Sequence, residues 1–272
     1  MECKLNGVTM YYEEYGEGRP ILIIHGFTPD HRLMSGCMEP VFAQKSGYRR
    51  IYPDLPGMGR TKGEDWIDST DKVLDILIEF IGRAIPEGNF LLAGESYGGY
   101  LIRGIAARMK ERVDGMLFLC PLIEPERSKR AVARFATITR DEAFIAGLKD
   151  EDKGFLDMAV VATAETFRRW KEEVDCGLRL ADTPFLQRLR NQYALSFDVD
   201  ALLGRYEKPT LFLLGKQDDA VGYEQALNLM ENYPRATYAI LDRAGHNLQI
   251  DQPGLFNCLA AEWLDRAEEY NR

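Results

Sequence analysis

A pentapeptide in the first half of the chain restricts its fold more than any other stretch, because residues 94–98 read GESYG. They match G-x-S-x-G, the pattern of a sharp strand-to-helix turn that presents a serine hydroxyl, here that of Ser96, above a sheet. A short apolar run, Phe90–Ala93, precedes the motif, and a helical pattern, Tyr100–Met109, follows it. With six serines and 24 glycines in 272 residues, chance would give about 0.05 matches. The motif therefore predicts a strand, a tight turn and a helix.

Similar short apolar runs alternate with helical patterns along most of the chain. The runs expected to form strands are Pro20–Ile24, Arg49–Pro53, Phe90–Ala93, Met116–Cys120, Thr210–Leu214 and Thr237–Leu241. Leu5–Val8 and Met10–Glu14 are expected to form a hairpin around Gly7. Apolar residues recur at helical spacing over 73–81 and over 101–109. This alternation predicts an α/β fold with a mostly parallel central sheet and helices on both faces.

The alternation stops near Leu122 and resumes near Pro209. The stretch between them has no clear strand, and its patterns predict helices around Ala131–Thr139, Asp141–Lys149, Asp152–Trp170 and Pro184–Ser196. We therefore expect one core domain, residues 1–121 and 209–272, interrupted by a helical cap, residues 122–208, above the carboxyl edge of the sheet.

The composition excludes several function classes. The net charge of −9 gives the chain no electrostatic reason to bind nucleic acid or an anionic membrane. The five cysteines are widely spaced without a CxxC pair, so we expect reduced thiols, a cytoplasmic location and no metal site. The N-terminus does not resemble a signal peptide. We expect a small-molecule substrate as the partner, and the sequence leaves the oligomeric state open.

A serine hydroxyl is a weak nucleophile that needs a base, and the base needs an orienting carboxylate. Of the three histidines, only His246 follows Ser96, and it lies directly after a predicted strand. The preceding predicted strand runs into two adjacent acids, Asp218 and Asp219. Both acids are candidates, and composition alone does not choose between them.

Two further loops carry recognisable patterns. His25-Gly26-Phe27 follows the predicted strand Pro20–Ile24, and residues 54–61 read DLPGMGRT after the next predicted strand. The first resembles the His-Gly-x-x loop of α/β-hydrolases, and the second resembles their D-x-P-G-x-G-x-S/T loop. With the loops of Ser96, the two aspartates and His246, the chain resembles a capped α/β-hydrolase over essentially its full length.

The resemblance implies a role for each matching residue. Ser96 is then the nucleophile and His246 the general base and acid. The family's Gly-x-x-Asp pattern falls on Asp218 as the acid that holds the imidazole. The backbone N–H groups of Phe27 and Tyr97 are the implied oxyanion donors. His25 is then structural, and no cofactor is implied.

The expected reaction is hydrolysis of a small carboxylic ester through an acyl-enzyme. Aspartate-dependent dehalogenases and epoxide hydrolases are disfavoured because a serine stands at position 96. Proline iminopeptidase-like aminopeptidases, carbon–carbon bond hydrolases and perhydrolases use the same triad and remain alternatives. A non-catalytic receptor for a small ligand is the alternative from another class, since fold alone does not fix function.

Overall fold

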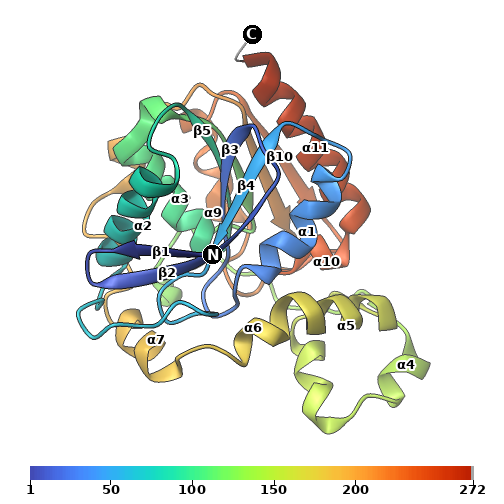
Figure 1. The fold of residues 1–272 in the computed structure, drawn as a ribbon. Helices are drawn as coiled ribbons and strands as arrows, with labels where there is room; N and C mark the ends of the chain where they lie inside the picture. Colours follow the sequence, from blue (N-terminus) through green and yellow to red (C-terminus); the bar gives the residue numbers. More distant parts are fainter. Residues whose placement is uncertain (271–272) are drawn as a thin grey trace.

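A computed structural model describes residues 1–270 and shows an eight-stranded sheet with helices on both faces (Figure 1). The strand order is β1-β2-β4-β3-β5-β6-β9-β10. The pairs β1–β2 and β2–β4 are antiparallel, whereas the pairs from β4 to β10 are parallel. The strands are β1 (Glu2–Leu5), β2 (Val8–Tyr15), β3 (Arg19–Ile24), β4 (Tyr48–Pro53), β5 (Phe90–Glu95), β6 (Val113–Leu119), β9 (Thr210–Gly215) and β10 (Ala236–Leu241).

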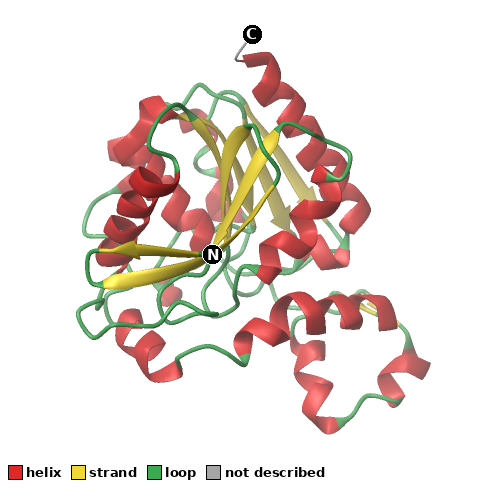
Figure 2. Cartoon of the chain, viewed as in Figure 1, coloured by secondary structure: helices red, strands yellow, loops and turns green. Residues whose placement is uncertain are grey.

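Helices cover the sheet in two layers (Figure 2). One layer holds α2 and α3, and the other holds α1 and α11, each with its own hydrophobic cluster against the sheet. The elements outside the predicted cap are α1 (Arg32–Phe42), α2 (Thr70–Ala84), α3 (Tyr97–Met109), η1 (Lys110–Arg112), α9 (Glu224–Leu227), η5 (Met230–Asn232), α10 (Leu248–Asp251) and α11 (Pro253–Tyr270). This arrangement confirms the predicted fold class. None of the helices in residues 1–270 combines the length and the apolar character that crossing a membrane requires.

The predicted strands match the observed ones to within a few residues, except at the N-terminus. Leu5–Val8, the first segment of the predicted hairpin, contains the turn between β1 and β2. Gly7 sits in this turn with φ of +81°, a backbone conformation that favours glycine. The predicted hairpin around Gly7 is thus present, and its two strands are β1 and β2.

Residues 122–208 form an insertion between β6 and β9, and Figure 1 places α4, α5 and α6 beyond one end of the sheet. Its elements are η2 (Arg127–Lys129), β7 (Thr139–Arg140), α4 (Glu142–Ala146), η3 (Asp150–Asp157), β8 (Val161–Ala162), α5 (Ala164–Trp170), η4 (Lys171–Asp175, a π-helix), α6 (Cys176–Leu178), α7 (Thr183–Arg190) and α8 (Val199–Leu203). The segment α8 packs against α3 of the core.

The insertion differs from expectation in two places. The predicted helix over Ala131–Thr139 is absent, and the predicted helix over Asp152–Trp170 is divided into η3, β8 and α5. Residues 131–138 have no regular secondary structure, and a parallel pair of two-residue strands, β7 and β8, lies where no strand was expected. β-Branched residues cluster at this pairing, and they favour strand over helix.

The strand order decides where the predicted site residues lie. Strands β5, β6, β9 and β10 are consecutive neighbours and parallel. Their carboxyl ends therefore share one edge, which is where ligands bind in open α/β sheets. Ser96 follows β5, Cys120 follows β6, Asp218 follows β9 and His246 follows β10.

Candidate active site

Ser96 occupies a sharp turn between β5 and α3. Its φ is +51°, an uncommon conformation for a residue with a side chain. The turn is fixed because Ser96 N–H donates to Leu119 O at 3.0 Å and Ser96 O accepts from Leu122 N at 2.9 Å. A Cβ added to Gly98 would lie 2.3 Å from Ile24 O. The second glycine of the motif is therefore required for α3 to approach β3.

Three of the predicted site residues form a hydrogen-bonded series. Ser96 Oγ lies 2.9 Å from His246 Nε2, and His246 Nδ1 lies 2.8 Å from Asp218 Oδ2. Asp218 is fully buried, and its Oδ1 accepts from the N–H groups of Ala220 and Val221 at 2.9 and 3.0 Å. The carboxylate is thus held by its own loop while it contacts the imidazole.

The structure separates the two adjacent aspartates. Asp218 contacts His246, whereas Asp219 is exposed. The sequence left both open as the acid partner, and the geometry joins only Asp218 to the imidazole.

The imidazole of His246 is flanked by two carboxylates. Besides Asp218 at Nδ1, Glu95 Oε1 lies 3.1 Å from Nε2. Burial acts to lower the pKa of His246, but the charges of Asp218 and Glu95 outweigh burial and raise it to about 9. Burial raises the pKa of Glu95 to about 7, while the charge of His246 acts against this rise.

Sequence reasoning missed Glu95. Its position in G-x-S-x-G accepts any residue, so the motif assigns it no task. One sequence signal could have indicated it. Glu95 is an ionisable residue at the end of a predicted buried strand, directly before the serine, and charged residues are rare in such places unless they are paired.

The N–H groups of Phe27 and Tyr97 take part in no hydrogen bond within residues 1–270. Their rings belong to an aromatic cluster with Tyr193 of the insertion. Phe27 meets both tyrosines edge-on at 5.3 and 5.2 Å between ring centroids, and Tyr97 stacks on Tyr193 at 5.0 Å. This cluster fixes the loop and the helix that carry the two free N–H groups.

His25 lies away from the Ser96 hydroxyl and connects two loops. It is fully buried, its Nε2 accepts from Leu55 N–H at 3.0 Å, and its Nδ1 lies 2.7 Å from Gly26 O. Burial lowers the pKa of His25. Next to it, Asp54 binds the N–H of Arg60 at 2.8 Å and Nδ1 of His31 at 2.7 Å. The DLPGMGRT loop thus holds the His25-Gly26-Phe27 loop through a hydrogen bond without contributing a side chain to the triad.

A cavity of about 700 Å³ opens over Ser96 and His246. Its lining comes from the loops after β3, β5, β9 and β10 and from the insertion. The lining residues are Phe27, Ser96, Leu122, Pro125, Glu126, Arg127, Arg130, Arg190, Asn191, Tyr193, Ala194, Ala220, Val221 and His246. Arg130 donates to three backbone carbonyl groups, those of Glu124, Pro125 and Ala220. Arg127 and Arg190 form no ion pair with a carboxylate within residues 1–270, and Arg190 lies over the Phe27 ring at 5.0 Å. The cavity therefore presents two available cations.

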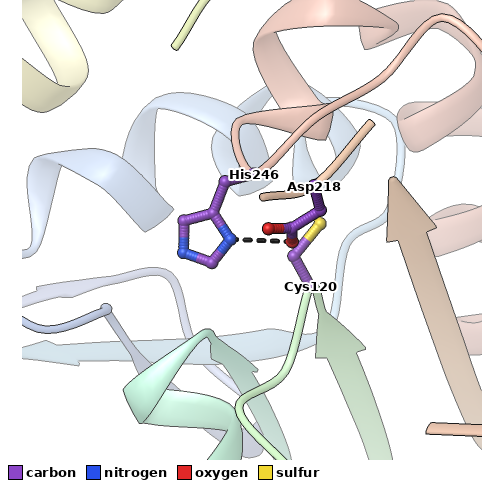
Figure 3. Close-up of side chains that lie close together, drawn as sticks. All are labelled: Cys120, Asp218 and His246. Atoms are coloured by element: carbon purple, nitrogen blue, oxygen red, sulfur yellow. Dashed lines mark hydrogen bonds and ion pairs between the residues drawn. The ribbon is translucent and has the colours of Figure 1, made fainter. Parts of the chain in front are cut away.

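Cys120 completes a group with Asp218 and His246 whose ligand atoms lie within 4.8 Å of one another (Figure 3). Such a set could hold a metal ion in principle. Burial raises the pKa of the Cys120 thiol well above its usual range, which disfavours the thiolate that binds metals. Asp218 already accepts three hydrogen bonds. The donor chemistry therefore fits a proton relay better than a metal site.

Comparisons with known proteins point to one family. The model of the alpha/beta hydrolase family matches residues 21–257. A curated relative, 2-hydroxy-6-oxo-6-(2'-aminophenyl)hexa-2,4-dienoic acid hydrolase of Metapseudomonas resinovorans, is 23% identical over 98% of this chain and 91% of its own length. Pimeloyl-[acyl-carrier protein] methyl ester esterase of Legionella pneumophila (strain Corby) is also 23% identical, over 94% of this chain and all of its own length.

The solved structures agree with this result. The alpha/beta superfamily hydrolase of Oenococcus oeni PSU-1 is 30% identical, with a TM-score of 0.90 over 98% of this chain and 99% of that one. The family match spans most of the chain, and the relatives are named hydrolases and esterases. The chain therefore belongs to the alpha/beta hydrolase family and is a hydrolase.

Proposed function

We propose that the protein hydrolyses small carboxylic esters, with Ser96 as nucleophile, His246 as general base and acid, and Asp218 as the orienting acid. The observation that carries this proposal is the series of hydrogen bonds from Ser96 through His246 to Asp218, at 2.9 and 2.8 Å. It lies at a cavity large enough for a small ester.

In the first half of the reaction, Ser96 Oγ attacks the ester carbonyl carbon while His246 Nε2 takes the hydroxyl proton. Asp218 holds Nδ1–H and stabilises the imidazolium. The N–H groups of Phe27 and Tyr97 supply donors for the oxygen that becomes negative. His246 then gives its proton to the alcohol oxygen as the carbon–oxygen bond breaks, which leaves the acyl group on Ser96.

In the second half, His246 takes a proton from water, and the resulting hydroxide attacks the acyl carbon. The same two N–H groups stabilise the second intermediate. Ser96 Oγ leaves with the proton that His246 returns, and the acid is released. This sequence needs only groups of this chain and water.

The charges of the cavity support an ester that carries an anionic end. Arg127 and Arg190 line the cavity without a carboxylate partner within residues 1–270. Guanidinium groups bind carboxylates through paired hydrogen bonds. One relative is named as an esterase and another as a dienoic acid hydrolase, so proteins named for both kinds of substrate are represented among similar proteins.

The test compares the wild type with Ser96→Ala on a panel of p-nitrophenyl esters of graded chain length, aminoacyl amides and a ring-cleavage dienoate. We expect ester turnover in the wild type and a loss of about 10³-fold or more in the variant. A clear preference for the amide or the dienoate would replace the ester proposal with the corresponding alternative. Failure of a fluorophosphonate probe to label Ser96 in the folded protein would favour a ligand-binding role.

A further inference from the structure

Glu95 contacts the same imidazole nitrogen as Ser96. Its Oε1 lies 3.1 Å from His246 Nε2, and Ser96 Oγ lies 2.9 Å from that atom. The Glu95 side chain is only 3% exposed. A buried carboxylate needs a partner, and the imidazole provides the one ion pair that this side chain forms within residues 1–270.

The neighbouring loop leaves room for this carboxylate. A Cβ added to Gly26 would lie 2.0 Å from Glu95 Oε2. The absence of a side chain at position 26 therefore allows Glu95 to lie between the His25-Gly26-Phe27 loop and His246. The placement is defined by packing on both sides, as a positioning role requires.

Nε2 forms its hydrogen bond with Ser96 Oγ, while Glu95 Oε1 contacts the same atom as an ion pair. A negative charge in contact with an imidazole favours its protonated form. We propose that Glu95 is a positioning residue whose charge stabilises the His246 imidazolium, and that it thereby sets the pH below which His246 stops acting as a base. The inference rests on the proposed roles of Ser96 and His246, and it is independent of which substrate the enzyme prefers.

The groups with an electrostatic effect on this pair are acids, whereas Arg127, Arg130 and Arg190 line the cavity that opens over His246. Five titratable groups on neighbouring elements affect the pKa of Glu95 or His246, or have a pKa that Glu95 affects. They are Cys37 of α1, Cys120 after β6, Tyr193 of the insertion, and Asp218 and Asp219 after β9. Burial raises the pKa values of both thiols and of the phenol, so these three groups remain neutral near pH 7. The other carboxyl groups are those of the two aspartates, and of these carboxyl groups only Glu95 contacts Nε2.

The sign of the effect follows from the charge of Glu95. A negative group beside Nε2 favours the imidazolium, and an imidazolium cannot take the proton of Ser96. Removal of the charge therefore frees the base at lower pH. Because an opposite charge in contact shifts a pKa by about one unit or more, Glu95→Gln should move the acidic limb of the pH profile down by about one pH unit or more.

The experiment measures the rate of Ser96 labelling by a fluorophosphonate, and kcat/KM for a p-nitrophenyl ester, from pH 5 to 10. The matched control is Asp219→Asn, which removes an acidic charge that is exposed and does not contact Nε2. We expect the limb to shift in Glu95→Gln and to shift by much less in the control. An unchanged limb in Glu95→Gln overturns the proposal, even if the plateau rate falls.

A second measurement on the wild type does not depend on the variant folding. The ¹⁵N signals of His246 should show two inflections, one as Glu95 ionises and one at higher pH as the imidazolium loses its proton. A single transition in the ordinary range of histidine contradicts the proposal. If the probe labels Ser96 but no ester is turned over, the ester proposal fails while the labelling profile still tests Glu95.

Discussion

At the scale of single residues, two adjacent aspartates with the same chemistry have different surroundings. Asp218 is fully buried and bound by two N–H groups and the imidazole, whereas Asp219 is exposed. The loop after β9 turns the Asp218 side chain toward His246 and leaves that of Asp219 exposed. Substitution of each aspartate in turn therefore tests which one is the acid of the triad.

Asp218→Asn should lower kcat for ester hydrolysis by about 10⁴-fold, because an amide no longer stabilises the imidazolium or holds its required tautomer. Asp219→Asn should remain within about threefold of the wild type, since an exposed charge is screened by solvent. Steady-state kinetics at one pH above the acidic limb measures both. Equal losses in the two variants would mean that the acid is not assigned correctly.

At the scale of elements, the approach of α3 to the sheet depends on a glycine. The Cβ of alanine at position 98 would lie 2.3 Å from the carbonyl oxygen of Ile24 in β3. Gly98→Ala should therefore lower the free energy of unfolding by about 2 kcal/mol or more, as overpacking does. Gly82→Ala in α2 meets no atom within 4 Å and should raise it by about 0.5–1 kcal/mol. Urea unfolding of both variants provides the measurement, and a neutral Gly98→Ala would contradict the close approach.

Helix α7 offers a matched pair of arginines. Arg190 lines the cavity and has no carboxylate partner within residues 1–270, whereas Arg188 pairs with Asp65 at 3.0 Å outside it. Arg190→Ala should lower kcat/KM about tenfold for a p-nitrophenyl ester whose acyl chain ends in a carboxylate. An ester of equal length that ends in a methyl group should be nearly unaffected.

Arg188→Ala serves as the control and should leave both esters unchanged. An equal loss for both esters in Arg190→Ala would show that this arginine shapes the cavity without recognising charge. Kinetics at low and high salt adds a check, because a charge contact weakens as ionic strength rises.

At the scale of the whole molecule, the sequence predicted the core well and the insertion poorly. Strands such as β3 and β9 are continuous apolar runs buried on both faces, and this pattern is strong. The pairing of β7 with β8 divides the segment 152–170. It joins residues about 22 positions apart, which local spacing does not encode. Glu95 was missed for a related reason, since its contact with His246 spans 151 positions.

The insertion and the core also meet at a residue that no motif marked. Asp251 Oδ2 accepts from Gly245 N–H at 3.0 Å, next to His246, and its Oδ1 accepts from Val161 N–H of β8 at 3.0 Å. One buried carboxylate thus connects the His246 loop to the insertion. Both hydrophobic clusters of the sheet likewise include residues of the insertion, such as Leu189 in one and Trp170 in the other. We therefore expect a single cooperative unfolding transition.

The pH dependence of stability tests this connection. Burial raises the pKa of Asp251 to about 6 from an ordinary value of 3.8, although backbone N–H groups act to lower it. The folded protein therefore binds more protons at this residue than the unfolded chain between these two values, so its contribution to stability falls as pH rises through that window. Asp251→Asn carries no such proton, and it loses one acceptor at every pH.

The variant should accordingly be less stable than the wild type at pH 4 and should recover part of the difference by pH 7. Urea unfolding followed by tryptophan fluorescence at half-unit steps measures this difference. The two stabilities should approach each other with rising pH, because only the wild type buries a charged carboxylate above pH 6, and burying that charge is unfavourable. A difference in the free energy of unfolding that stays constant from pH 4 to 7, or that grows with pH, would mean that burial between the insertion and the core does not raise the pKa of Asp251.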